Sequence, residues 1–416
     1  MNITITPSRL QGSVEAPPSK SLTQRAIAAG LLTGGTTVIH NPSFCNDSLA
    51  AMSMVQALGA TVVREEERIN IMAGERPSGP VTLNCGESGL ALRMFAPVAA
   101  LLSDSVTFTG EGSLLRRPVS MISEALSQLG VKVEAMEGLL PLKLSGRLRP
   151  GRAFIDGSSG SQLLTGLLMA LPMADGESQI DVASLTSKPY IGLTLGLLAD
   201  FGIRVEHENF RSFMIPGNQA YRAHEYTVEG DWSGAAFLVV AGATAGRVTV
   251  DGLNPWSLQA DRAVLHALEE AGVAMVTGPC GITSSLSGLR SFTFDATDTP
   301  DLFPPLAALA ARCEGTSRIR GVGRLRHKES DRAEAIADVL EAMRIKVNLS
   351  GDEMLITGGR VHGATVSSHN DHRIAMMAAV MAAGAAGPVT IAGAEAVNKS
   401  YPGFYNDLIS LGTSVS

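Results

Sequence analysis

Apolar and polar residues follow one arrangement six times along the chain: a helical stretch, a turn residue, and a short stretch of alternating apolar and polar positions. The first copy is the segment Ala57–Val62. Glycine at the turn can adopt the left-handed conformation that ends a helix, and alternation is typical of a half-buried strand. The turn residue stands at positions 59, 130, 202, 272, 344 and 412. Position 344 is Arg instead of Gly, so we expect that helix to end differently or to carry modest backbone strain.

The six turn positions lie 68 to 72 residues apart, and six such units fill the 416-residue chain. This period exceeds that of ordinary solenoid repeats, so each unit is expected to contain several strands and helices. A chain of this length is too long for one ordinary core and favours two domains. The pattern therefore predicts three units per domain, with the loose polar stretch 219–228 as the candidate boundary.

Two apolar segments argue against attachment to a membrane. Met1–Thr6 alternates as a strand does, and it lacks the basic start and apolar block of a signal peptide. The longest apolar stretch, Ile374–Gly387, is rich in Ala and Gly and shorter than the ~20 residues that a membrane span needs. We interpret it as a buried helix and expect a cytoplasmic protein without membrane attachment.

Composition excludes several classes of protein. Hydrophobic residues make up 45% of the chain and charged residues 18%, which is typical of a globular protein. The net charge of −7 argues against general binding of nucleic acid or of anionic membranes, although a local basic pocket stays compatible with it. The cysteines form no metal or redox motif, so we expect reduced thiols packed as small apolar groups. They are Cys45, Cys85, Cys280 and Cys313.

Several segments of the N-terminal half combine small residues with a basic or polar residue at the expected start of a helix. They are Pro18–Arg25, Gly86–Arg93 and Gly157–Gln162. Helix N-termini present free backbone N–H groups and the positive end of the helix dipole, and small residues let an anion approach them. An ordinary N-cap beside a solvated lysine explains any single segment better, whereas their repetition in one chain favours anion binding.

The C-terminal half adds three charged segments, Arg326–Arg332, Asn370–Arg373 and Asn398–Pro402. The second runs directly into the apolar stretch from Ile374, which places it at the start of a helix. The first could equally be a salt-bridged surface turn. Walker A, GxGxxG, HExxH and GxSxG motifs do not occur in the sequence.

Taken together, these segments resemble the EPSP synthase family in their order and spacing, over essentially the whole chain. The residues that carry the resemblance are Ser19-Lys20-Ser21 with Arg25, Gly89 with Arg93, Arg117-Pro118, Ser161-Gln162, Ser187-Lys188-Pro189-Tyr190, Lys328-Glu329-Ser330-Asp331-Arg332, Asn370-Asp371-His372-Arg373 and Lys399. The resemblance implies an α/β fold in which two domains, each of three βαβαββ units, form inside-out α/β barrels. It also implies domains of residues 1–19 with 229–416 and of residues 20–228, with the substrates between them.

The implied reaction transfers the enolpyruvyl (1-carboxyvinyl) group of phosphoenolpyruvate to the 5-hydroxyl of shikimate 3-phosphate and releases phosphate. It belongs to the shikimate pathway of chorismate and aromatic amino-acid biosynthesis. The hydroxyl loses a proton while C3 of the enol gains one, so a base and an acid are needed. Both substrates are phosphorylated carboxylates, which planar Arg side chains suit. The resemblance implies no metal and no cofactor, and we expect a monomer.

The site residues of the family can be carried over position by position. Those that match contacts to shikimate 3-phosphate are Lys20, Ser21, Arg25, Ser161, Gln162, Ser187, Asp301 and Lys328. Those that match contacts to phosphoenolpyruvate are Lys20, Gly89, Arg117, Gln162, Arg332, Arg373 and Lys399. Asp301 and Glu329 match the carboxylates of proton transfer, and Lys20 is counted with them as catalytic.

Four positions depart from the commonest pattern of the family. Glu87 stands where Asn is usual, Leu90 where Thr is usual, Gly160 where Ser is usual and Arg324 where Asn is common. Gly160 removes one hydroxyl contact to the substrate phosphate. Leu90 borders the phosphoenolpyruvate pocket, so glyphosate is expected to compete there with a strength that the sequence leaves open.

Two other functions are compatible with parts of this pattern. The related UDP-N-acetylglucosamine enolpyruvyl transferases carry a Cys in the loop before an Arg-Pro pair, and the matching segment Thr109–Pro118 has none. A non-catalytic anion-binding relative would have no need of both Asp301 and Glu329, which this chain retains.

Overall fold

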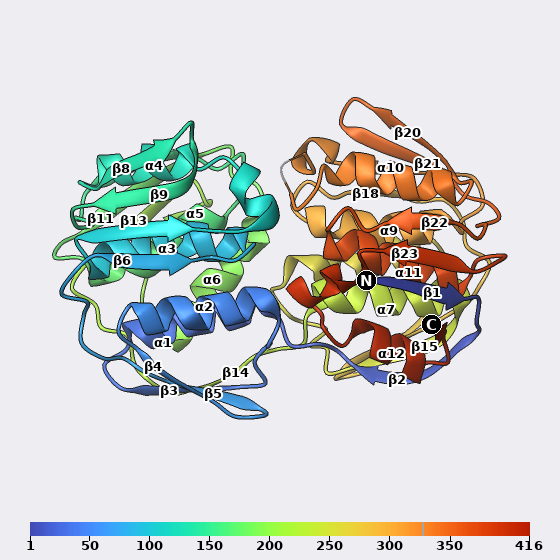
Figure 1. The fold of residues 1–416 in the computed structure, drawn as a ribbon, viewed down its shortest axis with the longest axis horizontal. Helices are drawn as coiled ribbons and strands as arrows, with labels where there is room; N and C mark the ends of the chain where they lie inside the picture. Colours follow the sequence, from blue (N-terminus) through green and yellow to red (C-terminus); the bar gives the residue numbers. More distant parts are fainter. Residues whose placement is uncertain (327) are drawn as a thin grey trace. The chain divides into compact units, whose positions relative to one another are not determined.

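The computed structural model describes residues 1–326 and 328–416, which form two compact units (Figure 1). Unit 1 comprises Met1–Ser19 with Glu229–Ser416, and unit 2 comprises Lys20–Val228. The chain therefore leaves unit 1 after its first residues, builds unit 2, and returns. Each unit has its own hydrophobic core, and both chain termini belong to unit 1.

Each unit contains three four-stranded sheets that share one connectivity. In the sheet β6-β7-β9-β8, the first two strands are parallel and are joined through a helix, while β9 is antiparallel to both of its neighbours. The elements of this copy are β6 (Val81–Asn84), α3 (Gly89–Leu102), β7 (Ser105–Thr109), α4 (Ser120–Gln128), β8 (Lys132–Met136) and β9 (Leu139–Ser145). The order βαβαββ is the predicted one.

The other two copies of unit 2 follow the same plan. One consists of β10 (Arg152–Asp156), α5 (Gln162–Ala170), β11 (Ser178–Ala183), α6 (Lys188–Asp200), β12 (Glu206–Glu208) and β13 (Ser212–Ile215). The other consists of α1 (Lys20–Leu32), β3 (Thr36–His40), α2 (Asn46–Ala57), β4 (Thr61–Arg64), β5 (Arg68–Met72) and β14 (Glu225–Thr227). In this last copy the final strand of the unit, β14, supplies the parallel partner of β3.

Unit 1 is built in the same way. Its first copy consists of β2 (Leu10–Glu15), α7 (Trp232–Ala245), β15 (Gly246–Asp251), α8 (Val264–Glu270), β16 (Ala274–Thr277) and β17 (Gly281–Ser285). Its second consists of β18 (Thr293–Asp295), α9 (Phe303–Ala310), β19 (Thr316–Arg320), α10 (Arg332–Ala342), β20 (Lys346–Ser350) and β21 (Glu353–Thr357). Its third consists of β22 (Thr365–Ser367), α11 (His372–Ala383), β23 (Val389–Ala392), α12 (Phe404–Ser410), β24 (Ser414–Val415) and β1 (Asn2–Thr6).

The predicted turn after each repeated helix is confirmed. All six turn residues have positive φ, from 77° at Gly272 to 101° at Gly412 for the glycines and 62° at Arg344. A left-handed conformation costs a non-glycine residue roughly 1–2 kcal/mol, so the helix before Arg344 ends in the same way as the others, under strain.

The first helix of every repeat lies in the interior of its unit. In unit 1 the helices α7, α9 and α11 pack against one another, and every residue of α11 is buried. Such helices are apolar on all sides, which explains the apolar stretch after Ile374. The strands are buried on alternate residues, as in β9, so the sheets cover the helices with one face. This is the predicted inside-out α/β arrangement, although the three sheets of each unit are separate and form no closed barrel within the described residues.

Three smaller predictions can be compared with the structure. The alternating N-terminal segment forms β1, as expected. Three of the four cysteines are buried, but Cys280 is exposed because it lies in the turn between β16 and β17, so its predicted packing was wrong. No helix in residues 1–326 and 328–416 combines the length and the apolar character needed to cross a membrane.

Candidate active site

The starts of the central helices of unit 2 bring several predicted residues together. Lys20, Gly89 and Gln162 are the first residues of α1, α3 and α5. Because these helices hold equivalent places in three repeats, their first turns meet at one end of the unit. Ser88 Oγ lies 3.2 Å from Gln24 Oε1, which links α3 to α1, and Arg93 Nη1 lies 3.3 Å from Gln162 Oε1, which links α3 to α5.

Lys20 is largely buried and paired. Its Nζ donates to Asp47 Oδ2 at 3.0 Å, and the two side chains are 16% and 12% exposed. Asp47 belongs to the first turn of α2, where a carboxylate is also favoured by the helix dipole. No motif in the sequence singles out Asp47, because an acidic residue in a first helical turn is common.

Arg25 is one of the largest fully buried side chains of the protein. Its Nε donates to Thr194 Oγ1 at 3.0 Å and its Nη1 to the carbonyl of Ser21 at 2.9 Å. Burial lowers the pKa of Arg25 to about 10, so the guanidinium stays charged at neutral pH. The predicted residues Ser21 and Arg25 are therefore in contact through the backbone of α1.

Two guanidinium groups converge on the first residue of α3. A methyl group on Gly89 would lie 2.7 Å from Arg117 Nη1 and 2.8 Å from Arg93 Nη1. Arg117 is only 7% exposed. Two positive charges beside a helix N-terminus make a site for an anion, and glycine is the residue that leaves room for both. Arg93, which is part of the motif but not of the predicted contact set, thus belongs to this site.

The remaining predicted residues of unit 2 precede helices. Ser161 is the N-cap residue of α5, and Ser187 precedes α6 with a left-handed backbone, φ 57°. A non-glycine residue in this conformation costs about 1–3 kcal/mol and often marks a functional site. A pocket of about 20 Å³, enough for a water molecule, opens beside α5. Its lining residues are Arg93, Met121, Ile155, Asp156, Ser159, Gly160, Gln162, Leu163 and Leu164.

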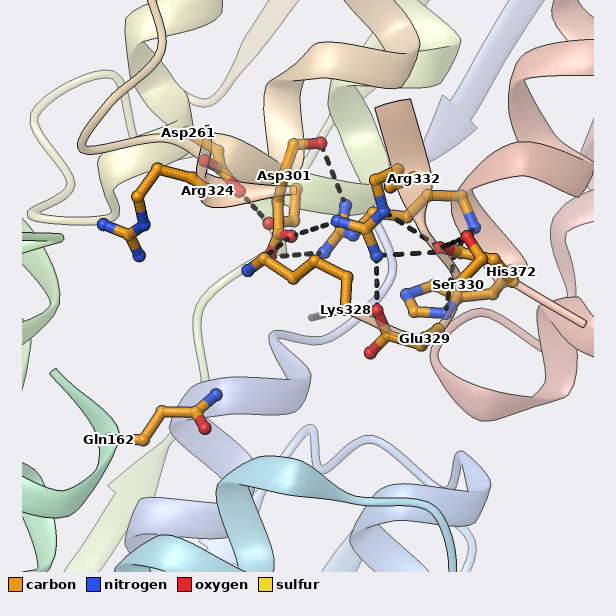
Figure 2. Close-up of polar contacts among 12 residues, drawn as sticks. Gln162, Asp261, Asp301, Arg324, Lys328, Glu329, Ser330, Arg332 and His372 are labelled. Carbon is orange, nitrogen blue, oxygen red and sulfur yellow. Dashed lines mark hydrogen bonds and ion pairs between the residues drawn. The ribbon is translucent and has the colours of Figure 1, made fainter. Parts of the chain in front are cut away.

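In unit 1 the predicted residues gather around Arg332, the first residue of α10 (Figure 2). Arg332 is fully buried and donates to three carboxylates: Asp301 Oδ1 at 2.7 Å, Glu329 Oε2 at 2.5 Å and Asp371 Oδ2 at 2.9 Å. Burial alone would lower the pKa of Arg332, but the attraction of the three carboxylates raises it above its usual range. The segment 328–332 is therefore not a surface turn at its C-terminal end, since Arg332 is enclosed.

Several cations surround the carboxylate of Asp301. Besides Arg332, Arg373 Nη2 lies 3.2 Å from Asp301 Oδ2 and Lys328 Nζ lies 3.6 Å from Oδ1. Burial raises the pKa of a carboxyl group, but here Arg373, Lys328 and Arg332 together outweigh it and hold the pKa of Asp301 well below its usual range. Burial lowers the pKa of Lys328 in turn. Asp301 is thus expected to be negatively charged at neutral pH.

Asp371 holds this cluster to the start of α11. Its side chain is fully buried, caps the helix by accepting from the N–H of Arg373 at 2.9 Å, and also binds Arg332. Ser330 Oγ donates to the same carboxylate at 3.2 Å. Asp371 belongs to the quoted motif, but no role was predicted for it. An acidic residue directly before an apolar helix is typical of an N-cap, and this pattern could have suggested a capping role for Asp371.

Lys399 and the residues before α11 form a second contact in unit 1. Lys399 is 7% exposed, and its Nζ donates to the carbonyl of Asn370 at 2.6 Å. His369 and Asn370 both have left-handed backbones, φ 51° and 55°. Two strained residues in succession indicate that the turn before α11 is held in an unusual conformation by its surroundings.

Asp261 is a buried acid that sequence reasoning missed. It lies in the 3₁₀ helix η3 (Ala260–Ala263), accepts from Ser233 Oγ, and is 1% exposed. Burial first, and then the negative charge of Asp301, raise the pKa of Asp261 to about 6. A lone Asp in a short helix belongs to no motif, so nothing in the sequence indicates this environment.

Each unit thus carries its own part of the predicted site. Unit 2 holds a candidate anion site on α3, with Lys20 and Arg25 on α1, and unit 1 holds the cluster of Asp301, Glu329 and Arg332. Among residues 1–326 and 328–416, no group of three or more His, Cys, Asp and Glu side chains is arranged to hold a metal ion.

Comparison with known proteins gives one consistent result. Residues 5–408 match the family described as EPSP synthase (3-phosphoshikimate 1-carboxyvinyltransferase). The chain is 37% identical over 420 residues to a 3-phosphoshikimate 1-carboxyvinyltransferase of Clostridium kluyveri, covering 99% of this chain and 98% of the relative. It is 39% identical over 414 residues to the protein of the same name from Aeropyrum pernix, covering 99% and 96%.

A solved structure agrees with these relatives. EPSP synthase from Acinetobacter baumannii superposes with a TM-score of 0.82 at 25% identity, over 100% of this chain and 99% of that one. Sequence and fold agree along the full length, so the chain belongs to the EPSP synthase (3-phosphoshikimate 1-carboxyvinyltransferase) family.

Proposed function

We propose that the protein transfers the enolpyruvyl group of phosphoenolpyruvate to the 5-hydroxyl of shikimate 3-phosphate. The products are phosphate and 5-enolpyruvylshikimate 3-phosphate, in the shikimate pathway of aromatic amino-acid biosynthesis. The observation that carries the proposal is the carboxylate of Asp301 held among Arg332, Arg373 and Lys328, in a member of this family. An acceptor for the hydroxyl proton and cations for the donor's anionic groups then stand side by side.

Phosphoenolpyruvate brings a phosphate and a carboxylate, and the proposed residues match this demand. Its cationic contacts are Lys20 and Arg117 from unit 2 and Arg332, Arg373 and Lys399 from unit 1, and Gly89 and Gln162 complete the set. Bidentate Arg side chains suit both anionic groups. The two guanidinium groups over Gly89 support an anion site at the start of α3.

Shikimate 3-phosphate is proposed to bind mainly through unit 2. The residues assigned to it are Lys20, Ser21, Arg25, Ser161, Gln162 and Ser187 from unit 2 and Asp301 and Lys328 from unit 1. Arg25 is held rigidly by Thr194 and by the Ser21 carbonyl, and such fixed groups lose little entropy when a ligand binds.

In the proposed reaction Asp301 accepts the proton of the 5-hydroxyl as its oxygen attacks C2 of the enol. Glu329, with Lys20, is assigned to the proton that C3 gains. The tetrahedral adduct then loses a proton from C3 to the same group as its bond to phosphate breaks, which forms the enol ether. A base works best when its pKa lies near the working pH, and three cations hold that of Asp301 far below it. Substrate anions that bind Arg332 and Arg373 would offset this attraction and raise the pKa of Asp301 when it is needed.

The test is phosphate release from phosphoenolpyruvate, measured with and without shikimate 3-phosphate, together with mass spectrometry of the product. We expect stoichiometric phosphate and the enolpyruvyl ether only when both substrates are present. Replacing shikimate 3-phosphate by UDP-N-acetylglucosamine should give no phosphate. A protein that binds both substrates without forming the ether would be a non-catalytic relative and would overturn the proposal.

The proposal includes a monomer that acts in the cytoplasm on these two small molecules, without nucleic acid or membrane. Light scattering at micromolar concentration tests the oligomeric state, and a mass of twice the 43.4 kDa chain would contradict it.

A further inference from the structure

The carboxylate of Glu87 has a defined place in unit 2. Its Oε2 accepts from the backbone N–H of Ser113 at 2.9 Å. Ser113 is in the first turn of the 3₁₀ helix η1 (Gly112–Arg116), whose early N–H groups have no partner within the helix. The N-cap residue of η1, Glu111, directs its own carboxylate to Asn84 Nδ2 at 2.9 Å. Glu87 therefore caps η1 from another part of the chain.

Gly112 makes room for this contact. Its φ is +52°, and a methyl group there would lie 2.4 Å from Glu87 Oε2. Any larger residue at this position would push the carboxylate away from Ser113 N and would also be strained. The contact between Glu87 and Ser113 therefore requires glycine at position 112.

The two ends of this contact support opposite sides of one anion site. Ser88, which follows Glu87, caps α3 through its hydroxyl, at 3.2 Å from the N–H of Ala91, and so fixes the helix that begins with Gly89. Arg117 directly follows η1, and its Nη1 lies over Gly89. The backbone of the two segments is joined as well, since Glu111 N donates to the Gly86 carbonyl at 2.7 Å.

We propose that Glu87 is a positioning residue, which caps η1 and thereby keeps the Arg117 guanidinium over Gly89 for binding of phosphoenolpyruvate. It acts through Arg117 and not by contact with the substrate. The inference rests on the proposed function, because it takes phosphoenolpyruvate as the anion at this site.

The experiment measures phosphoenolpyruvate binding by calorimetry without shikimate 3-phosphate, so that no turnover adds heat, and then KM and kcat for both substrates. Glu87→Ala removes the acceptor of a charge-assisted hydrogen bond, so we expect the Kd and KM for phosphoenolpyruvate to rise about tenfold or more. The KM for shikimate 3-phosphate should stay within about twofold. Glu87→Gln keeps an acceptor oxygen and should recover most of the loss. Glu134→Ala, an exposed acid of unit 2 paired with Lys132, is the matched control and should change neither constant.

Gly112→Ala provides a second test. It should displace Glu87 and raise the same Kd, and the effects of Gly112→Ala and Glu87→Ala combined should be smaller than the product of the two. Should Glu87→Ala fail to fold, Glu87→Gln and Gly112→Ala decide on their own.

The outcomes that overturn the proposal are an unchanged Kd in Glu87→Ala, equal losses in Glu87→Ala and Glu87→Gln, or independent effects of Glu87 and Gly112. Turnover by the parent protein is a separate readout. If the parent binds phosphoenolpyruvate but does not convert it, the proposed function is wrong. The ratio of each variant's Kd to that of the parent then still tests the positioning role of Glu87. A parent that does not bind phosphoenolpyruvate overturns both.

Discussion

The guanidinium of Arg373 donates to the carboxylate of Asp301 across 3.2 Å, and so joins a residue proposed to bind phosphoenolpyruvate to the proposed base. Arg332 makes the same connection at 2.7 Å. In the proposed reaction, binding and proton transfer therefore use one set of charges. A ligand that engages either arginine changes the acidity of Asp301 in the same step.

Asp301→Asn should separate catalysis from folding. The amide keeps an oxygen for Arg332 but cannot take a proton, so we expect kcat to fall roughly 10²–10⁴-fold while the protein stays folded and binds shikimate 3-phosphate. Steady-state kinetics and circular dichroism measure this. Asp295→Asn, a 57% exposed acid of the same repeat, is the control and should keep normal kcat. A near-normal kcat in Asp301→Asn would remove Asp301 from the mechanism.

Asp261 should make stability depend on pH between about 4 and 6. Its pKa in the folded protein is about 6, against about 4 in an unfolded chain, so the native state holds the proton more tightly. Protonated Asp261 therefore adds to the free energy of unfolding at low pH. This contribution, about 3 kcal/mol in total, is lost as the pH rises through this window. Asp261→Asn should abolish the decline, as followed by urea unfolding at several pH values.

The contribution of Asp301 to stability can be distinguished from that of Asp261. Because the pKa of Asp301 is lowered in the folded protein, its charged form stabilises the fold above about pH 4, and this stabilisation is lost only on further acidification. The charged groups that act on Asp261 are Asp301, Arg373 and Asp231. An unchanged pH dependence in Asp261→Asn would show that another group causes it.

Asp371→Ala should be strongly destabilising. It removes the cap of α11 and one of the three carboxylates around buried Arg332, so we expect the free energy of unfolding to fall by about 3–5 kcal/mol. The control is Asp338→Ala on α10, whose 61% exposed carboxylate pairs with His369 and should cost under about 0.5 kcal/mol. Urea unfolding with equal m-values tests the difference. A similar small loss in both variants would mean that Asp371 does not anchor the cluster.

Gly89→Ala should weaken binding of phosphoenolpyruvate. Its methyl group would displace the guanidinium groups of Arg93 and Arg117, so we expect the KM for phosphoenolpyruvate to rise about tenfold with a smaller change in kcat. Glyphosate is expected to compete with phosphoenolpyruvate in the parent protein and to bind less tightly to the variant. Gly79→Ala, where a methyl group meets open space, is the control. Inhibition that ignores the phosphoenolpyruvate concentration would contradict a shared site.

The repeat and the class of reaction could be predicted from the sequence, whereas the ion-pair partners of the charged residues could not. The repeat was visible because helix ends and strand alternation are local patterns, and even Arg344 keeps the left-handed turn. The pairing of Lys20 with Asp47, or of Asp301 with Arg373 72 residues away, depends on how separate repeats pack. Hence candidate residues for the site could be named from the resemblance, whereas the low pKa of Asp301 and the raised pKa of Asp261 could not be predicted.

The placement of the first strands has a consequence for the nascent chain. All three sheets of unit 2 are complete once β14 has left the ribosome, because β14 pairs with β3. Ile5 in β1 pairs with Val389 and Val415, so this strand has no sheet partner until β23 has been made. Unit 2 can therefore fold while β1, which is made before it, still waits for its partner strands.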